Sequence, residues 1–163
     1  MKQHHIKLIT YTALTAALCV IGSFIKIPGF ITSSALDTLP ALVSVLYLPP
    51  LYSGFVAALG HLATGLYSGM PLGIFHALIA LEMMILLIVF NMLHRKQRHI
   101  LKWIFVLIFN GILSPLPFYF LVSPAFFVAS VPSLLIATAI NCIIAMIFMP
   151  ILQKIIVRKD IMR

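Results

Sequence analysis

The middle of the chain reads HRKQRHILK, from His94 to Lys102, and this short basic stretch separates two long apolar runs. It holds four of the eleven Lys and Arg residues, whereas the whole chain has only three acidic residues. The cations other than Lys26 fall into three groups: Lys2 and Lys7; Arg95, Lys96, Arg98 and Lys102; and Lys154, Arg158, Lys159 and Arg163. The spacing of these groups limits how often the chain can cross a membrane.

The apolar runs between the basic groups predict six transmembrane helices. With six crossings, both termini and the 94–102 loop lie on one side, and ten of the eleven cations share that side. The positive-inside rule assigns that side to the cytoplasm. Five or seven crossings would place the two terminal basic groups on opposite sides. The sequence therefore predicts an all-α integral membrane protein, one domain over residues 1–163, with both termini cytoplasmic.

The composition supports the same prediction. A hydrophobic fraction of 63% and a mean hydropathy of +1.16 exceed the values of soluble domains. Each spanning helix needs about 20 residues, so six helices with tight turns use nearly all of the 163 residues. The net charge of +8 then reflects topology, not nucleic-acid binding. Its expected electrostatic partner is the lipid bilayer, with anionic headgroups at the cytoplasmic rim.

Proline and glycine mark the ends of the predicted helices. The Pro-Gly pair at 28–29 stops the first helix, and the Pro-Pro pair at 49–50 separates the second from the third. The two prolines within 115–117 predict a bend in the fifth helix. The second helix is too short to span alone, and an apolar outer loop is expected over 123–130. The predicted helices cover about 6–25, 38–48, 51–67, 72–93, 101–122 and 131–156.

Ionisable groups inside the apolar runs mark a candidate binding site. Placing each of them at the middle of a membrane helix costs about 2.5–3.5 kcal/mol, so each is expected to have a structural or functional role. Tracing every helix from its assigned side places these groups and their polar neighbours between the midplane and the outer surface, whereas the cytoplasmic half has almost no buried polar group. This asymmetry predicts a cavity that opens outward. Its candidate ligand-binding residues are Asp37, His61, Thr64, Tyr67, His76, Glu82, Asn110, Ser114 and Asn141.

The same residues also have purely structural interpretations. Asp37 could only cap the second helix. The two histidines could be satisfied by hydrogen bonds between helices, and the Asn and Ser side chains could only join helices. Glu82 is the hardest to explain in this way, because a carboxyl group at mid-membrane needs a partner. Cys19 and Cys142 lie inside apolar runs and indicate neither a disulfide nor a metal site.

The chemistry of the predicted cavity favours a neutral or weakly basic, nucleoside-like ligand. Carboxyl and amide groups suit the hydroxyls of a ribose, whereas Lys26 is the only cation in the outer half, which disfavours a phosphate. Several aromatic side chains could provide a flat apolar slot for a ring: Phe30, Tyr67, Phe75, Phe118 and Tyr119.

These features together resemble the substrate-binding S components of energy-coupling factor (ECF) transporters. The likeness covers the whole chain and includes six helices, cytoplasmic ends and an alanine-rich first helix with the AxxxA pair Ala13 and Ala17. The segments SSALDTLP (Ser33–Pro40) and GHLATGLYSGMPLG (Gly60–Gly73) look most like the α-ribazole branch. α-Ribazole is the ribosylated dimethylbenzimidazole of cobalamin salvage.

The resemblance implies a vitamin-binding subunit of a prokaryotic plasma membrane, without catalysis, cofactor or metal of its own. Loop 1, about 26–36, would cap the site through Phe30, Ser33 and Ser34. A transmembrane coupling subunit and two cytoplasmic ATPases would supply the energy. Ala13 and Ala17 would then lie on the surface that docks the coupling subunit, since small residues let helices approach closely.

Three alternatives stay open at this point. The chain could be an S component for another vitamin such as riboflavin. It could also be a small proton-coupled membrane transporter that uses Glu82 as its exchanging group. An intramembrane enzyme could use His61, His76 and Glu82 as a metal set, although no HExxH or paired-aspartate motif accompanies them.

Overall fold

The computed structural model describes residues 2–29 and 34–161, with residues 2, 4 and 157–161 described by their backbone alone. This part of the chain is helical, apart from turns and an isolated antiparallel bridge between Lys26 and Ala35. The elements are α1 (Lys2–Ser23), α2 (Thr38–Ser44), α3 (Pro50–Tyr67), α4 (Phe75–Arg95), α5 (His99–Ile108), the π-helix η1 (Phe109–Leu113), α6 (Pro117–Leu121) and α7 (Pro124–Ile161). Four segments of the described chain are long and apolar enough to cross a membrane: His5–Ser23, Phe75–Arg95, His99–Leu121 and Pro124–Ile156.

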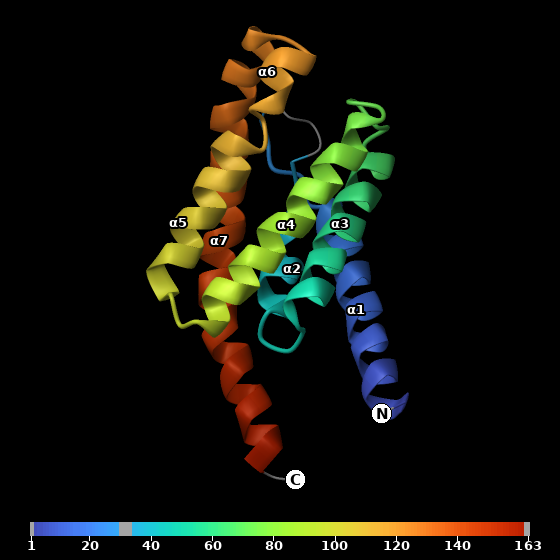
Figure 1. Ribbon diagram of the computed structural model, residues 1–163, viewed down its shortest axis with the longest axis vertical. Coiled ribbons are helices and arrows are strands. Elements are labelled where there is room, and N and C mark those ends of the chain that lie inside the picture. The colour runs from blue at the N-terminus through green and yellow to red at the C-terminus, as the bar shows by residue number, and fades with distance from the viewer. Residues whose placement is uncertain (1, 30–33, 162–163) are drawn as a thin grey trace.

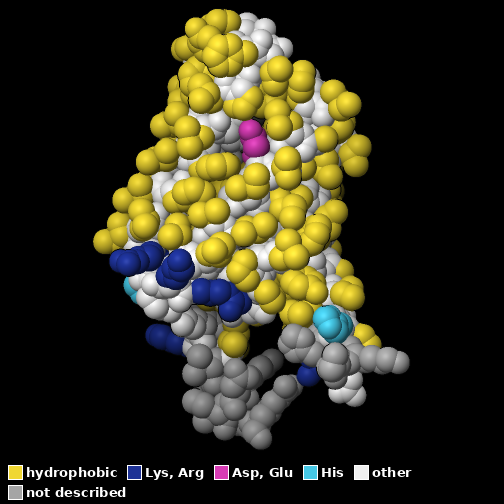
Figure 2. Space-filling view, in the orientation of Figure 1, with side chains coloured by type: hydrophobic (Ala, Val, Ile, Leu, Met, Phe, Trp, Pro, Cys, Tyr) yellow, Lys and Arg dark blue, Asp and Glu magenta, His cyan; other side chains and the backbone are white. Residues whose placement is uncertain are grey.

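The two ends of the bundle differ in their content of Lys and Arg side chains. Figure 1 shows that α1 begins and α7 ends at the same end of the bundle as the connection between α4 and α5. Figure 2 shows Lys and Arg side chains gathered at that end, whereas apolar side chains cover most of the remaining visible face. We call this the basic end and the opposite one the far end. Apolar flanks with most cations gathered at one end are typical of a membrane protein.

The second predicted helix, expected to be too short to span alone, is a short buried helix. α2 has seven residues, Thr38–Ser44, so it rises about 10 Å, a third of a hydrocarbon core. It contacts α1, α3 and α7, and most of its residues are buried. The predicted end near residue 48 is wrong, because turn hydrogen bonds such as Leu46 N–H to the Val43 carbonyl (3.2 Å) lead the chain into α3.

The fifth predicted helix is interrupted where its prolines predict a bend. α5 continues into η1, in which the Ser114 N–H donates to the Phe109 carbonyl over 2.7 Å. Pro115 and Pro117 cannot donate a backbone hydrogen bond, so the regular ladder ends there and α6 starts anew at Pro117. π-Turns of this kind often occur at functional sites.

The predicted outer loop over 123–130 is wrong, since α7 already begins at Pro124. The Ser123 hydroxyl accepts the Phe126 N–H over 3.1 Å, which is the bond of an N-cap residue to position N3. Pro124 then occupies N1, where its missing N–H costs nothing. Ser123 and Pro124 therefore start this helix about two turns before the predicted start near Val131.

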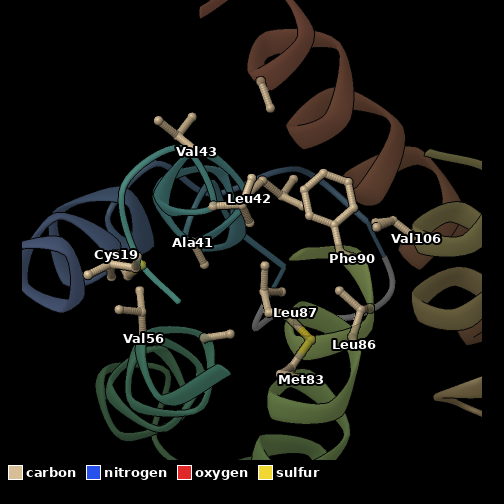
Figure 3. Close-up of a cluster of buried hydrophobic side chains, with 14 of the residues drawn as sticks. Cys19, Ala41, Leu42, Val43, Val56, Met83, Leu86, Leu87, Phe90 and Val106 are labelled. Atoms are coloured by element: carbon tan, nitrogen blue, oxygen red, sulfur yellow. The ribbon is translucent and has the colours of Figure 1, made fainter. Parts of the chain in front are cut away.

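The apolar core lies between α2, α3 and α4 and is completed by α1, α5 and α7. Figure 3 shows Leu42, Phe90 and Val106, from three different helices, pointing into the same space. Cys19 and Cys142 are buried and free, and both belong to this cluster. α1 is the most peripheral of the four candidate spans, because only 17% of its apolar window is buried.

A buried polar network joins α4 to the α2–α3 turn near the basic end. Asn91 Nδ2 donates to the Leu48 carbonyl (3.0 Å) and to Ser53 Oγ (2.8 Å). Arg95 Nε donates to Asn91 Oδ1 over 2.8 Å, and Ser44 Oγ donates to Ser53 Oγ over 2.9 Å. The prediction that this half has almost no buried polar group is therefore wrong. Backbone carbonyls freed by the α2–α3 turn require these donors.

Replacing Asn91 with alanine is expected to destabilise the bundle by about 1–2 kcal/mol, because it leaves the Leu48 carbonyl and the Ser53 hydroxyl without their amide partner. The apparent Tm of the purified protein in detergent should fall by about 3–6 °C. Met92→Ala is the matched control, since Met92 neighbours Asn91 and its side chain is 46% exposed. Equal melting of the two variants would contradict this role of Asn91.

Candidate functional site

A cavity lies in the far half of the bundle, between the first halves of α4 and α7 and the bent α5–α6 region. It holds about 680 Å³ of empty space, its open side included. The segment before α2, the first residue of α2, one side chain of α3 and one residue of the α3–α4 connection complete the lining. The lining residues are Ser34, Ala35, Asp37, Thr38, His61, Leu72, Ile79, Met83, Asn110, Ser114, Pro115, Phe118, Phe126, Ser130, Leu134, Ala137, Thr138 and Asn141.

Asp37 is a buried acceptor in the cavity wall, 9% exposed. The Thr64 hydroxyl donates to its Oδ2 over 2.7 Å, and the Thr38 hydroxyl lies 3.2 Å from its Oδ1. The carboxyl group makes no capping hydrogen bond to α2, although Asp37 occupies the N-cap position. Capping alone therefore does not account for this residue. Thr64 does not line the cavity but orients the carboxyl group from behind.

The two histidines form a pair between α3 and α4. His61 Nε2 lies 3.2 Å from His76 Nδ1, so one ring donates and the other accepts. His61 lines the cavity, whereas His76 is fully buried behind it. Gly65 makes room for the His76 ring, because a Cβ at that position would lie 2.9 Å from Nδ1. His76 therefore positions His61 and does not reach the cavity.

Glu82 of α4 contacts a different neighbour from His76 on the same helix. The Ser114 hydroxyl donates to Glu82 Oε2 over 2.6 Å, and Ser114 itself lines the cavity. Glu82 is half-buried and lies outside the lining. Beside this pair, Asn110 Nδ2 donates to the Thr138 hydroxyl over 2.7 Å, which joins η1 to α7. The π-helix thus places two polar side chains, Asn110 and Ser114, on the cavity wall.

Asn141 connects α7 to the segment that leads into α2. Its Nδ2 donates to the Ala35 carbonyl over 3.0 Å and to the Ala137 carbonyl over 2.9 Å. Asn141 Oδ1 and Ser34 Oγ are buried in the cavity wall and have no hydrogen-bond partner among the described residues. Buried polar atoms without partners are costly. These two atoms are therefore available to a polar ligand.

Two stretches beside the cavity, 25–27 and 34–36, pair with each other in antiparallel fashion. The Ile27 N–H donates to the Ser34 carbonyl and the Leu36 N–H to the Ile25 carbonyl, both over 3.1 Å. Of the three predicted gating residues, Ser34 lines the cavity. Phe30 and Ser33 lie outside the described residues. The described part of loop 1 thus reaches the cavity wall through Ser34 and Ala35.

Tyr67 does not reach the cavity. Its ring is 57% exposed, packs edge-on against Phe24 at 4.6 Å and lies 5.2 Å from the Lys26 ammonium. Of the described aromatic residues expected to form a ring slot, Phe118 lines the cavity, and Phe75 packs against it from behind at 5.8 Å. Tyr119 is exposed. Phe126, which the sequence interpretation missed, lines the cavity beside Phe118.

Three hydroxyl residues of the lining were also missed: Thr38, Ser130 and Thr138. Ser130 lies in the segment that was predicted as a loop. Thr138 is three residues before Asn141, on the same helix face, and this spacing could have identified it. The other hydroxyl, Thr38, begins α2 directly after Asp37.

The lining has acceptors, donors and two phenyl rings but includes no Lys or Arg among the described residues. A multiply charged anion would lack a counter-charge there, whereas a hydroxylated ligand with a flat ring meets partners for both parts. The described residues contain no group of three or more His, Cys, Asp or Glu side chains placed to hold a metal ion. The wall therefore suits binding of a neutral polar molecule.

The AxxxA pair of α1 lies on the outside of the bundle. Ala13 and Ala17 are both exposed, and their larger neighbours Leu14 and Leu18 are 58% and 52% exposed. The intramolecular contacts of α1 are made through other residues, such as Thr15, whose hydroxyl lies 2.8 Å from Tyr47 Oη. This face of α1 thus presents a shallow strip of small side chains.

Comparison of the chain with protein-family models, with curated proteins and with solved structures gave no significant match.

Proposed function

We propose that the protein is the substrate-binding S component of an ECF-type vitamin uptake transporter, and that its substrate is α-ribazole. The observation that carries the proposal is the far-end cavity, where Ser34 Oγ and Asn141 Oδ1 are buried, find no hydrogen-bond partner in the described part of the chain, and share the lining with Asp37. The ribose hydroxyls of α-ribazole would pair with these atoms. Its dimethylbenzimidazole ring would lie against Phe118 and Phe126.

The proposed orientation places the basic end in the cytoplasm and the cavity on the outer side of a prokaryotic plasma membrane. The positive-inside rule supports this choice, because the Lys and Arg side chains gather at the basic end in Figure 2. α2 and α3 would act together with the four apolar spans as the remainder of a six-helix bundle. The proposed partners are a transmembrane coupling subunit and two ATPases.

Uptake of labelled α-ribazole tests the proposal. The chain is expressed with a coupling subunit and its ATPases in cells that do not otherwise take up the compound. We expect accumulation that stops when the ATPases carry a Walker-motif substitution and continues when a protonophore collapses the proton gradient. Accumulation without the ATPases would contradict the proposal.

A second candidate is a proton-coupled transporter, favoured by the 2.6 Å contact between Glu82 and the cavity-lining Ser114. A protonatable carboxyl group beside a substrate cavity can link the two fluxes. This candidate predicts the reverse result in the same cells. Uptake would stop with the proton gradient and persist when the ATPases are inactive.

A further inference from the structure

A groove at the basic end lies between the α4–α5 turn and the second half of α7, away from the far-end cavity. It holds about 540 Å³ of empty space, its open side included. Its lining combines nitrogen donors from α4 and α5 with methionines and a proline from α7. The lining residues are His94, Gln97, His99, Lys102, Trp103, Met146, Met149, Pro150 and Gln153.

Lys102 is buried in this groove in an unusual way. A lysine that serves topology alone extends its ammonium group into water at the membrane surface. Lys102 is instead only 4% exposed. Its Nζ lies 2.9 Å from His94 Nδ1 and above the rings of Phe90 (5.4 Å) and Trp103 (4.9 Å). The positive-inside rule explains the presence of a cation here but not its burial.

No acidic side chain is placed to balance this cation within the described part of the chain. The described acidic side chains, Asp37 and Glu82, pair with Thr64 and Ser114 around the far-end cavity. A buried ammonium group without an anion is costly. The aromatic faces and the histidine nitrogen offset a part of that cost, and an anion in the groove would offset more.

The surroundings of the groove favour a lipid as the source of that anion. Its two walls continue into side chains that face outward from the bundle: on α5, Ile100, Leu101 and Ile104 are 76%, 51% and 46% exposed; on α7, Ile147 and Ile151 are 57% and 53% exposed. A bound headgroup would therefore have apolar surface for its acyl chains directly beside it. Basic pockets between membrane helices bind anionic headgroups in this way.

We propose that this groove binds the phosphate of an anionic phospholipid, with Lys102 as the main contact and His94, Gln97 and His99 at its rim. The ligand differs from the proposed vitamin in both charge and location. The site would couple the basic end to the surrounding anionic lipid, independently of what the far-end cavity binds.

Trp103 provides the measurement, because it lines the groove and is the single tryptophan of the chain. The full chain is reconstituted in phosphatidylcholine vesicles that contain an equal fraction of either brominated phosphatidylglycerol or brominated phosphatidylcholine. We expect brominated phosphatidylglycerol to quench Trp103 with an apparent association constant about fivefold higher, the preference that one lysine gives to a headgroup with net negative charge over a zwitterionic one. Equal quenching by the two lipids would overturn the proposal.

Variants assign the preference to Lys102. Lys102→Met should abolish it, and Lys102→Arg should keep it. Lys96→Met is the matched control, because Lys96 lies in the neighbouring α4–α5 turn but is exposed, and it should keep the preference. If Lys96→Met loses the preference for phosphatidylglycerol and Lys102→Met retains it, the assignment of the preference to Lys102 is overturned. If Lys102→Met does not fold, the lipid comparison in the native chain still decides.

Free phosphate is the remaining source of the same chemistry. Inorganic phosphate added to phosphatidylcholine vesicles should leave the Trp103 emission unchanged. A saturable change with phosphate, equal to that produced by phosphatidylglycerol, would overturn the lipid as the ligand. These results do not depend on α-ribazole binding, so the two proposals fail separately.

Discussion

Replacing Asp37 with alanine is expected to weaken α-ribazole binding by about 10-fold to 100-fold, the loss typical of a hydrogen bond to a carboxyl group. The carboxyl group lies in the cavity wall with Thr64 2.7 Å from Oδ2, so it is already oriented before a ligand arrives. Pre-oriented polar groups give a ligand site most of its specificity. An equilibrium titration of the purified variant measures the change in Kd.

Two variants separate ligand contact from orientation. Thr64→Val removes the hydroxyl that donates to Asp37 but keeps the carboxyl group, and it should raise Kd by about fivefold. Asp37→Asn keeps the shape of the side chain, and its Kd should lie between those of Thr64→Val and Asp37→Ala. An unchanged Kd in a correctly folded Asp37→Ala variant would show that the ligand does not use this carboxyl group.

Replacing Ala13 with tryptophan is expected to abolish ATP-driven uptake while vitamin binding stays unchanged. Ala13 is exposed on α1, far from the cavity lining, so the added indole has no reason to disturb the site. Two helices that meet at small residues are pushed apart by a large one. Uptake into vesicles that contain the coupling subunit and ATPases, together with a binding titration, measures both effects.

Leu18→Trp is the matched control for this surface. Leu18 is 52% exposed on the same helix but lies about 140° around it from Ala13. It should keep both binding and uptake. Normal uptake by Ala13→Trp, or equal loss in both variants, would contradict the docking role of the AxxxA strip.

The parts of the fold that charge and proline determine were predicted from the sequence. Basic residues at both ends of the chain and at 94–102 predict that these three regions share one side, and Figure 1 shows the start of α1, the end of α7 and the α4–α5 connection at the same end of the bundle. The bend near Pro115 was likewise predicted, because two prolines within three residues remove two backbone donors from the helix. Features of the fold that depend on strong local constraints, such as charge and proline, were therefore predicted from the sequence.

The candidate residues at the cavity were predicted only in part. Asp37, His61, Asn110, Ser114 and Asn141 line it. The carboxyl, imidazole and amide groups among them are costly to place in a membrane without a partner. Hydroxyl groups produce no comparable signal, since they can bond to their own helix. Ser130 does so through the Phe126 carbonyl at 2.6 Å and still lines the cavity.

Features that depend on contacts between distant segments were missed. The apolar run from 38 to 48 does not reveal where its helix ends, because the chain after α2 is held by Asn91 and Arg95 of α4, which bond to the Leu48 carbonyl. Lys102 looked like one more topological cation, because its burial against Trp103 and the α7 wall is a property of the packed bundle.

An equilibrium titration of the detergent-purified chain with α-ribazole tests the central claim most directly, with riboflavin titrated in parallel. The account predicts saturable binding of α-ribazole at one site per chain with submicromolar Kd, weakened by Asp37→Ala. Binding of riboflavin alone would replace the proposed substrate. Saturable binding of neither compound to a folded chain would contradict the assignment of the far-end cavity as a vitamin site.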